Sequence, residues 1–122
     1  MEYRKWFKVS VNKKTLEYRI KEHKLYLEGK GGRKINFKNA DLSYVDLSGL
    51  DLSGVCFENC NLEGANLSHC NLEGANFTNA NCRDVDFSYS NLDNADFIAT
   101  CLVGICLVGI NRKWTSKKKY LF

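Results

Sequence analysis

The sequence predicts an all-β solenoid over residues 35–109, because three regularities run together through this part of the chain. These residues divide into fifteen consecutive pentapeptides without a gap. The third position of the pentapeptide is Leu or Phe in fourteen of them, with Cys82 the exception. The fifth position is Gly or Asn in ten. The third position therefore marks a repeating inward side chain, and the fifth marks a repeating corner.

A five-residue period fits neither an amphipathic helix nor a long alternating strand. In a short extended segment the first and third side chains point inward while the second and fourth point outward. The first position is small or apolar except at Ser90 and Thr100, and the second is Asn or Asp in twelve pentapeptides. Gly and Asn tolerate the backbone conformations of a tight turn. We therefore expect short extended segments joined by corners.

This pattern resembles the pentapeptide-repeat family, whose motif is A-(D/N)-L-x-x. The resemblance implies a right-handed quadrilateral β-helix with four pentapeptides in each coil. Residues twenty positions apart would then stack, and one column of third positions consists entirely of phenylalanine: Phe37, Phe57, Phe77 and Phe97. Fifteen pentapeptides make about four coils, which is a rod of roughly 18 Å at the ~4.8 Å spacing of neighbouring strands.

The solenoid is flanked by a basic N-terminal cap, residues 1–34, and a basic C-terminal tail or cap, residues 110–122. The alternation of Phe7, Val9 and Val11, then of Leu16, Tyr18 and Ile20, predicts two strands around a turn at residues 12–14. A helix from Thr15 with Leu16, Ile20 and Leu27 inward is the alternative. Residues 25–29 fit the repeat frame, so a degenerate coil is expected before the clear ones.

The net charge of +4 conceals an acidic middle between two basic ends. Residues 1–34 contain eleven Lys or Arg and four Glu, a net of +7. Residues 35–109 contain ten Asp or Glu and two basic residues, a net of −8, and residues 110–122 contain five basic residues and no acid. Such an asymmetry concerns binding partners more than the fold.

The residues predict neither catalysis nor a cofactor. Six cysteines and two histidines raise the question of a metal site. The repeat frame, however, places Cys60 and Cys70 inward on opposite sides and Cys56 outward, so they do not converge on one tetrahedral ion. His69 is expected at an exposed corner with Tyr89 as its neighbour twenty residues away, rather than an acid or a thiol. We therefore expect no metal, and cysteines that serve as small apolar filler.

Our first functional hypothesis is a non-catalytic inhibitor whose acidic rod mimics nucleic acid and occupies a DNA- or RNA-handling enzyme. Pentapeptide-repeat proteins of the quinolone-resistance type resemble duplex DNA and engage topoisomerases, although they are longer rods. By this analogy a phage-encoded counter-defence inhibitor or a topoisomerase modulator is expected. Two sides of the solenoid contain acids and no base, and their partner-binding residues would be Asp46, Asp51, Glu73, Asp86 and Asp93.

Two other hypotheses use the ends of the rod. An adaptor for protein–protein contacts would use apolar residues that also suit an end cap or a homodimer through the C-terminal end: Ile98, Val103, Val108, Trp114, Leu121 and Phe122. A direct nucleic-acid binder would use basic residues near both termini: Arg4, Lys5, Lys8, Lys117, Lys118 and Lys119. The sequence shows no export signal and no apolar run of the ~20 residues that a membrane span needs. A cytoplasmic location is expected, in a bacterial cell or in the host cell of a phage.

Overall fold

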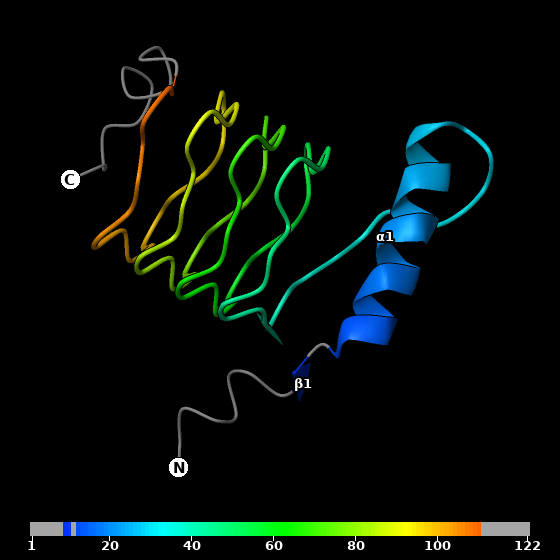
Figure 1. Ribbon diagram of the computed structural model, residues 1–122, viewed down its shortest axis with the longest axis horizontal. Coiled ribbons are helices and arrows are strands. Elements are labelled where there is room, and N and C mark those ends of the chain that lie inside the picture. Colours follow the sequence, from blue (N-terminus) through cyan, green and yellow to red (C-terminus); the bar gives the residue numbers. More distant parts are fainter. Residues whose placement is uncertain (1–8, 11, 111–122) are drawn as a thin grey trace.

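The computed structural model describes residues 9–10 and 12–110, and it consists of a short strand, a helix and a solenoid (Figure 1). Strand β1 (Val9–Ser10) comes first, helix α1 (Lys13–Leu27) follows, and strand β2 (Ala40–Asp41) lies in the first coil. Isolated parallel bridges then run from Asn36↔Cys56 to Asp86↔Cys106, each joining residues twenty apart. One coil is therefore twenty residues, or four pentapeptides, although the described chain contains little regular sheet.

The corners are closed by one hydrogen bond and by one unusual backbone angle. At twelve of the fifteen corners the N–H of the next first-position residue donates to the carbonyl of the preceding third position, as in Ala75 to Leu72 at 3.0 Å, whereas the Cys70 N–H donates to the Ser90 hydroxyl. All fifteen fifth-position residues have positive φ, from 56° at Ala99 to 78° at Gly49. This left-handed region favours Gly and Asn, which explains the ten Gly or Asn residues at this position.

The second-position side chains stabilise the outer surface of each pentapeptide. In all twelve pentapeptides with Asn or Asp at this position, Oδ1 accepts a hydrogen bond from the backbone N–H two residues later. This is the local turn that both residue types form readily. Because only Oδ1 is needed, the amide and the carboxylate are interchangeable for folding. The surface charge of the solenoid can therefore vary without loss of the turn.

The core is a column of third-position side chains, and the predicted phenylalanine stack is confirmed. Phe37 and Phe57 have ring centroids 5.5 Å apart, and Phe77 and Phe97 stack at 5.0 Å with an interplanar angle of 1°. Phe87, from another side of the coil, meets Phe77 edge-on at 5.6 Å. Stacked and edge-to-face rings are the favourable arrangements for aromatic pairs. These ring contacts favour the register in which residues twenty positions apart lie over one another in successive coils.

Three inward side chains at the first position donate a hydrogen bond to the backbone: those of Cys70, Ser90 and Thr100. The Cys70 Sγ donates to the carbonyl of Leu47 at 3.1 Å, and the Thr100 Oγ1 donates to that of Phe77 at 2.7 Å. Ser90 makes the corresponding bond to Leu67. Each donor reaches a third-position carbonyl twenty-three residues earlier. The polar group of each side chain is therefore hydrogen-bonded although it points into the core.

The predicted β-rich cap is wrong at residues 13–27, because these residues form α1. Asn12 is the N-cap, and its side chain accepts from the N–H of Thr15 at 2.9 Å. Leu16 is buried and Ile20 packs against the core, whereas Tyr18 is 64% exposed. The spacing of Leu16 and Ile20 thus reflects a helical period, as in the alternative interpretation, and an all-β assignment does not hold for the whole chain. Leu27, which that alternative also placed inward, is 42% exposed, and the helix begins at Lys13 rather than at Thr15.

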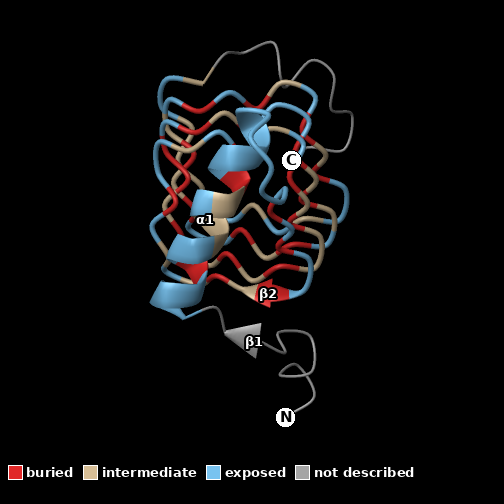
Figure 2. Ribbon diagram, turned by 90° about the vertical axis from the view of Figure 1, so that its right-hand side faces the viewer, coloured by how far each residue is buried: buried red, intermediate tan, exposed pale blue. Residues whose placement is uncertain are grey.

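Helix α1 lies across the N-terminal end of the solenoid (Figure 2). The expected degenerate coil at residues 25–29 is also wrong, since residues 25–27 are the end of this helix. Strand β1 pairs in parallel with β2, Val9 with Ala40 and Ser10 with Asp41. The segment before the helix therefore adds to an edge of the first coil rather than forming a hairpin.

Candidate interaction surface

The acidic residues singled out in the sequence all lie on two adjoining sides of the solenoid. We call residues 45–49, 65–69, 85–89 and 105–109 the third side, and residues 50–54, 70–74 and 90–94 the fourth side. Together they contain five acids and no Lys or Arg: Asp46 and Asp86 on the third side, and Asp51, Glu73 and Asp93 on the fourth. The twenty-residue coil brings these residues, which are up to 47 positions apart in sequence, onto one acidic surface.

Three of the five carboxylates are held by the turn geometry. Oδ1 of Asp46 accepts from the N–H of Ser48 at 2.9 Å, and Asp86 makes the same bond to Ser88 at 2.9 Å. Asp51 accepts from both the N–H and the hydroxyl of Ser53. The Ser48 hydroxyl and N–H lower the pKa of Asp46, and those of Ser88 lower the pKa of Asp86, against the smaller opposing effect of burial. Both carboxylates are therefore firmly ionised at neutral pH.

Glu73 and Asp93 occupy fourth positions twenty residues apart, so they come from successive coils of the fourth side. Glu73 is exposed and Asp93 is half-buried. The Gly54 N–H donates to the Glu73 carbonyl and the Gly74 N–H to the Asp93 carbonyl, both at 2.8 Å. These bonds fix the backbone from which both carboxylates project, and like charges at this spacing favour a cationic partner.

The corners that border the third side carry three exposed rings. Tyr44 lies on one corner, where its hydroxyl is 3.4 Å from Glu63 Oε2, and Glu63 raises its pKa. His69 and Tyr89 lie on the other corner, stacked with ring centroids 5.0 Å apart and an interplanar angle of 14°. The sequence interpretation placed His69 at an exposed corner correctly but did not identify the stack as a feature. Its twenty-residue separation from Tyr89 was the available signal.

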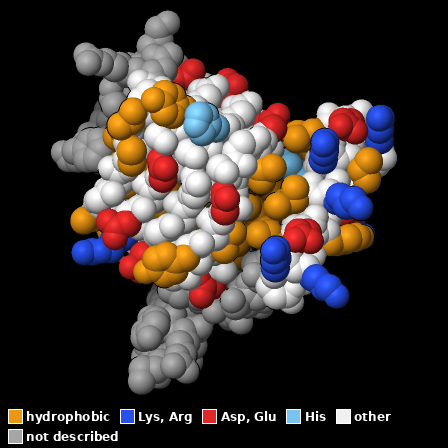
Figure 3. Space-filling model, viewed as in Figure 1, with side chains coloured by type: hydrophobic (Ala, Val, Ile, Leu, Met, Phe, Trp, Pro, Cys, Tyr) orange, Lys and Arg blue, Asp and Glu red, His pale blue; other side chains and the backbone are white. Residues whose placement is uncertain are grey.

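The remaining two sides have a mixed charge. Lys38 forms an ion pair with Glu58 at 3.5 Å. Arg83 is the other basic residue of the repeats, and the acids of these sides are Asp41, Glu58, Glu63, Asp84 and Asp96. Figure 3 shows acidic side chains spread over the solenoid, whereas Lys and Arg gather mainly on the helix end. The acidic surface is thus distinguished by its lack of bases, not by a larger number of acids.

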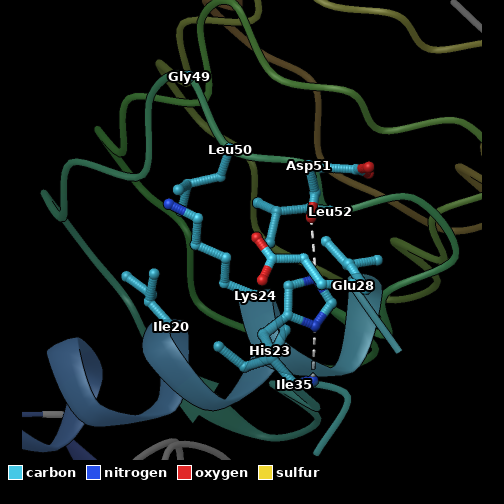
Figure 4. A pocket seen from close by; sticks show the side chains of 10 residues that line it. Ile20, His23, Lys24, Glu28, Ile35, Gly49, Leu50, Asp51 and Leu52 are labelled. Atoms are coloured by element: carbon cyan, nitrogen blue, oxygen red, sulfur yellow. Dashed lines mark hydrogen bonds between the residues drawn. The ribbon is translucent and has the colours of Figure 1, made fainter. Parts of the chain in front are cut away.

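A cavity of about 340 Å³ lies between α1 and the first coil. His23 crosses this junction, where its Nδ1 accepts from the Ile35 N–H at 3.1 Å and its Nε2 is 2.8 Å from the Asp51 carbonyl (Figure 4). Because Nδ1 accepts, Nε2 is the protonated nitrogen of a neutral ring. Both ring nitrogens are occupied in joining the helix to the solenoid, so the geometry assigns His23 a structural role.

The apolar residues predicted for an end contact point outward in the last coil. Ile98, Val103 and Val108 are 49%, 56% and 58% exposed. They belong to three successive sides, so they surround the coil rather than forming one patch on a single side. The other predicted end-contact residues lie outside the described part of the chain, as do all the predicted basic contacts: Trp114, Leu121, Phe122, Arg4, Lys5, Lys8, Lys117, Lys118 and Lys119.

The cysteines do not assemble into a site in the described residues. Cys60, Cys70 and Cys82 are buried, and all six are free thiols. Burial raises the pKa of each of the three buried thiols. Across residues 9–10 and 12–110, no group of three or more His, Cys, Asp or Glu is arranged to hold a metal ion. In the same residues, no helix is long and apolar enough to cross a membrane.

Comparison with known proteins gives a family match and several similar solved structures. The model of the pentapeptide repeat region matches residues 33–107. A pentapeptide repeat protein of the Arabidopsis thaliana thylakoid lumen is 33% identical, with a TM-score of 0.49 over 62% of this chain and 50% of that chain. The alr5209 pentapeptide repeat protein of Nostoc PCC 7120 is 26% identical, with a TM-score of 0.42 over 77% of this chain and 80% of its own.

HetL, a pentapeptide repeat protein involved in heterocyst differentiation regulation in Nostoc sp. strain PCC 7120, is 27% identical, with a TM-score of 0.34. That alignment covers 62% of this chain and 42% of HetL. The chain therefore spans half or less of the Arabidopsis protein and of HetL. No curated protein matches the sequence significantly.

Proposed function

Because this chain belongs to the pentapeptide-repeat family, whose members fold as right-handed β-helices, we propose that it is a non-catalytic binding protein that presents the acidic surface of its solenoid to a protein partner. The observation that carries this proposal is the distribution of charge. The third and fourth sides contain five acids and no base, whereas the other two sides mix five acids with two bases. A surface of one sign selects a partner of the opposite sign and speeds the encounter.

The chemistry of the acidic surface favours a partner that handles nucleic acid. Duplex DNA carries one phosphate charge per ~3.4 Å of each strand. Five carboxylates along a rod of roughly 18 Å, at the ~4.8 Å spacing of coils, approach the charge density of one strand. Ionised carboxylates held by turn geometry, as at Asp46 and Asp86, resemble a fixed row of phosphates. We infer that the solenoid occupies the basic groove of a DNA- or RNA-handling enzyme and inhibits it.

The test compares two variants that remove the same charge from different sides. In the first, Asp46, Asp51, Asp86 and Asp93 become Asn and Glu73 becomes Gln. In the second, the five acids of the other sides are changed in the same way: Asp41→Asn, Glu58→Gln, Glu63→Gln, Asp84→Asn and Asp96→Asn. Asn preserves the turn at second positions, because it forms that turn elsewhere in the solenoid.

The readout is affinity capture from cells of the native host, followed by competition with duplex DNA. The wild type and the second variant are expected to retain the same basic, nucleic-acid-binding protein, and DNA is expected to displace it. The first variant is expected to lose it. Retention of that protein by the first variant, or equal loss by both, contradicts the proposal.

A second candidate function, an adaptor that acts through the end of the solenoid, is favoured by the exposure of Ile98, Val103 and Val108. The equivalent positions of earlier coils hold Ser, Thr, Glu, Lys or Arg, so the outward side chains of the last coil are the apolar ones, and the end of a solenoid needs a polar or covered surface. Replacing all three by Ser is then expected to abolish binding to a partner, or self-association measured by sedimentation. Unchanged binding and an unchanged sedimentation coefficient contradict this function.

A further inference from the structure

We propose that the acidic surface recognises arginine in preference to lysine, with one guanidinium of the partner stacked on His69 in the open space at Gly49. This inference rests on the proposed function, because it names the side chain that the acidic surface selects. Three features carry it: the direction in which corner side chains lean, the empty position at Gly49, and the two exposed carboxylates that flank Gly49 in the sequence.

Corner side chains lean over the next coil. A Cβ added at Gly64 would lie 2.4 Å from the Tyr44 ring, and one added at Gly109 would lie 2.4 Å from the Tyr89 ring. Asp84 leans over Gly104 in the same way. In these three cases a fifth-position side chain covers a glycine twenty positions later. Where both corner residues carry rings, as at His69 and Tyr89, the rings stack, so we infer that a planar group at position 49 would lie against the His69 ring.

Position 49 holds glycine, and a Cβ built there meets no heavy atom within 4 Å. The His69 ring stacks on Tyr89 on the side of the later coil, at 5.0 Å. Its other face is thus directed toward the open space at Gly49. A planar group of the right size extends the stack of His69 and Tyr89 by one layer, with no rearrangement of the protein.

The side chains around Gly49 favour a planar cation as the group that stacks on His69. Asp46 precedes Gly49 by three residues and Asp51 follows it by two, and both are exposed. Arginine stacks on aromatic faces and presents a fork of donors to carboxylates, whereas lysine is a compact, strongly hydrated point charge. Gly49 and Lys24 of α1 both line the cavity between the helix and this coil, so we expect the guanidinium to approach from the solvent side, away from the Lys24 ammonium.

The experiment measures binding of the full chain to hexa-arginine and hexa-lysine peptides by fluorescence anisotropy, with the two peptides compared at the same salt concentration and the comparison repeated at a higher one. One stacked guanidinium at an exposed site is worth roughly 0.5–1 kcal/mol, so hexa-arginine is expected to bind about two- to fivefold more tightly. The chain has two histidines, one on the surface and one buried at the helix junction. Hexa-arginine is expected to shift the His69 ring resonances in NMR spectra and to leave those of His23 in place.

A matched pair of variants isolates the open space. Gly49→Asn fills it, and Asn adopts the required backbone at Asn59 and Asn79, with φ of 58° and 60°. Gly74→Asn is the control, because Gly74 also has positive φ and nothing within 4 Å, but lies on a different corner. Gly49→Asn is expected to remove the preference for arginine, and Gly74→Asn to retain it.

The outcomes separate this inference from the proposed function. Equal binding of both peptides, an unshifted His69, or an arginine preference that survives Gly49→Asn overturns the arginine site. Equal binding of both peptides that also weakens with salt leaves the acidic surface in place as the partner site. Failure of both peptides to bind overturns the two proposals together.

Discussion

The rings of Phe57 and Phe77 lie parallel, with centroids 4.8 Å apart and an interplanar angle of 3°. That separation equals the spacing of adjacent strands, so the two side chains stack one coil above the other without tilting. Phe97 continues the column at 5.0 Å. A slip of one pentapeptide would replace ring-on-ring contacts by rings against Leu or Cys, and the column therefore helps to set the register of the coils.

Phe77 has a ring on either side, so truncating it should open a void inside the column. Phe77→Ala is expected to lower the free energy of unfolding by about 3–5 kcal/mol. Phe77→Leu should cost less, because Leu fills the third position on the other sides of the coil. Urea unfolding followed by circular dichroism measures both. Equal stability of the two variants would show that the stack contributes little.

The second-position turn gives a different kind of prediction, because it depends on an oxygen rather than on volume. Oδ1 of Asn66 accepts from the Ser68 N–H at 2.9 Å. Asn66→Ala removes the acceptor and is expected to cost about 1 kcal/mol of stability. Asn66→Asp keeps the acceptor and should be close to neutral at pH 7. If Ala and Asp are equally destabilising in thermal unfolding, the turn bond is not the reason for this preference.

The solenoid could be predicted closely because its pattern repeats every five residues along the chain and its stacking contacts join residues twenty positions apart. The inward position of Leu62, the corner at Asn59 and the column of Phe37 follow from periodicity and turn chemistry. The turn made by Asn or Asp was not deduced, although its chemistry is local. The pattern instead suggested only that these side chains point outward, and it therefore treated Asp46 simply as a surface charge.

The N-terminal segment was harder because its pattern supports two periods. Leu16, Tyr18 and Ile20 alternate as in a strand, yet Leu16 and Ile20 are also one helical turn apart. The contact that decides between them is distant: His23 joins Ile35 and Asp51. The ring stack at the candidate site was missed for a different reason. Tyr89 was expected as the neighbour of His69 through the coil, but the pair was considered only as a possible catalytic or metal site and not as two stacked rings.

His23 should be important for attaching α1 to the solenoid. His23→Leu keeps an apolar body but leaves the Ile35 N–H and the Asp51 carbonyl without this partner. A buried unpaired group costs ~1–3 kcal/mol, so we expect faster amide exchange at Ile35 and lower thermal stability. His69→Ala, a change at the exposed histidine, is the control and should leave that exchange rate unchanged. Unaltered exchange at Ile35 in His23→Leu would contradict the role.

The Asp46 carboxylate belongs to the acidic surface and also contributes to the stability of the folded protein at low pH. Its pKa is lowered chiefly by the hydroxyl and N–H of Ser48. A lowered pKa in the folded state stabilises the protein above the unfolded value of ~3.9, and this contribution is lost as the pH falls through the folded pKa. Ser48→Ala removes the hydroxyl, so the pKa of Asp46 should rise toward its ordinary value in an NMR titration. An unchanged titration would assign the shift to the backbone N–H alone.

The six cysteines should divide into two classes by reactivity. Cys60, Cys70 and Cys82 are buried, and burial raises the pKa of each, so their reactive thiolate is scarce at neutral pH. Cys101 is exposed, and Cys56 and Cys106 are half-buried on the outer surface.

With iodoacetamide at pH 8, mass spectrometry is expected to show alkylation first at Cys101, then at Cys56 and Cys106. The buried three should react only after denaturant unfolds the coils, and Cys82, inside the column of third positions, should be among the slowest. Alkylation of Cys82 in the folded protein at the rate of Cys101 would mean that the coils open readily, because no rotation of a side chain alone brings that thiol to the surface.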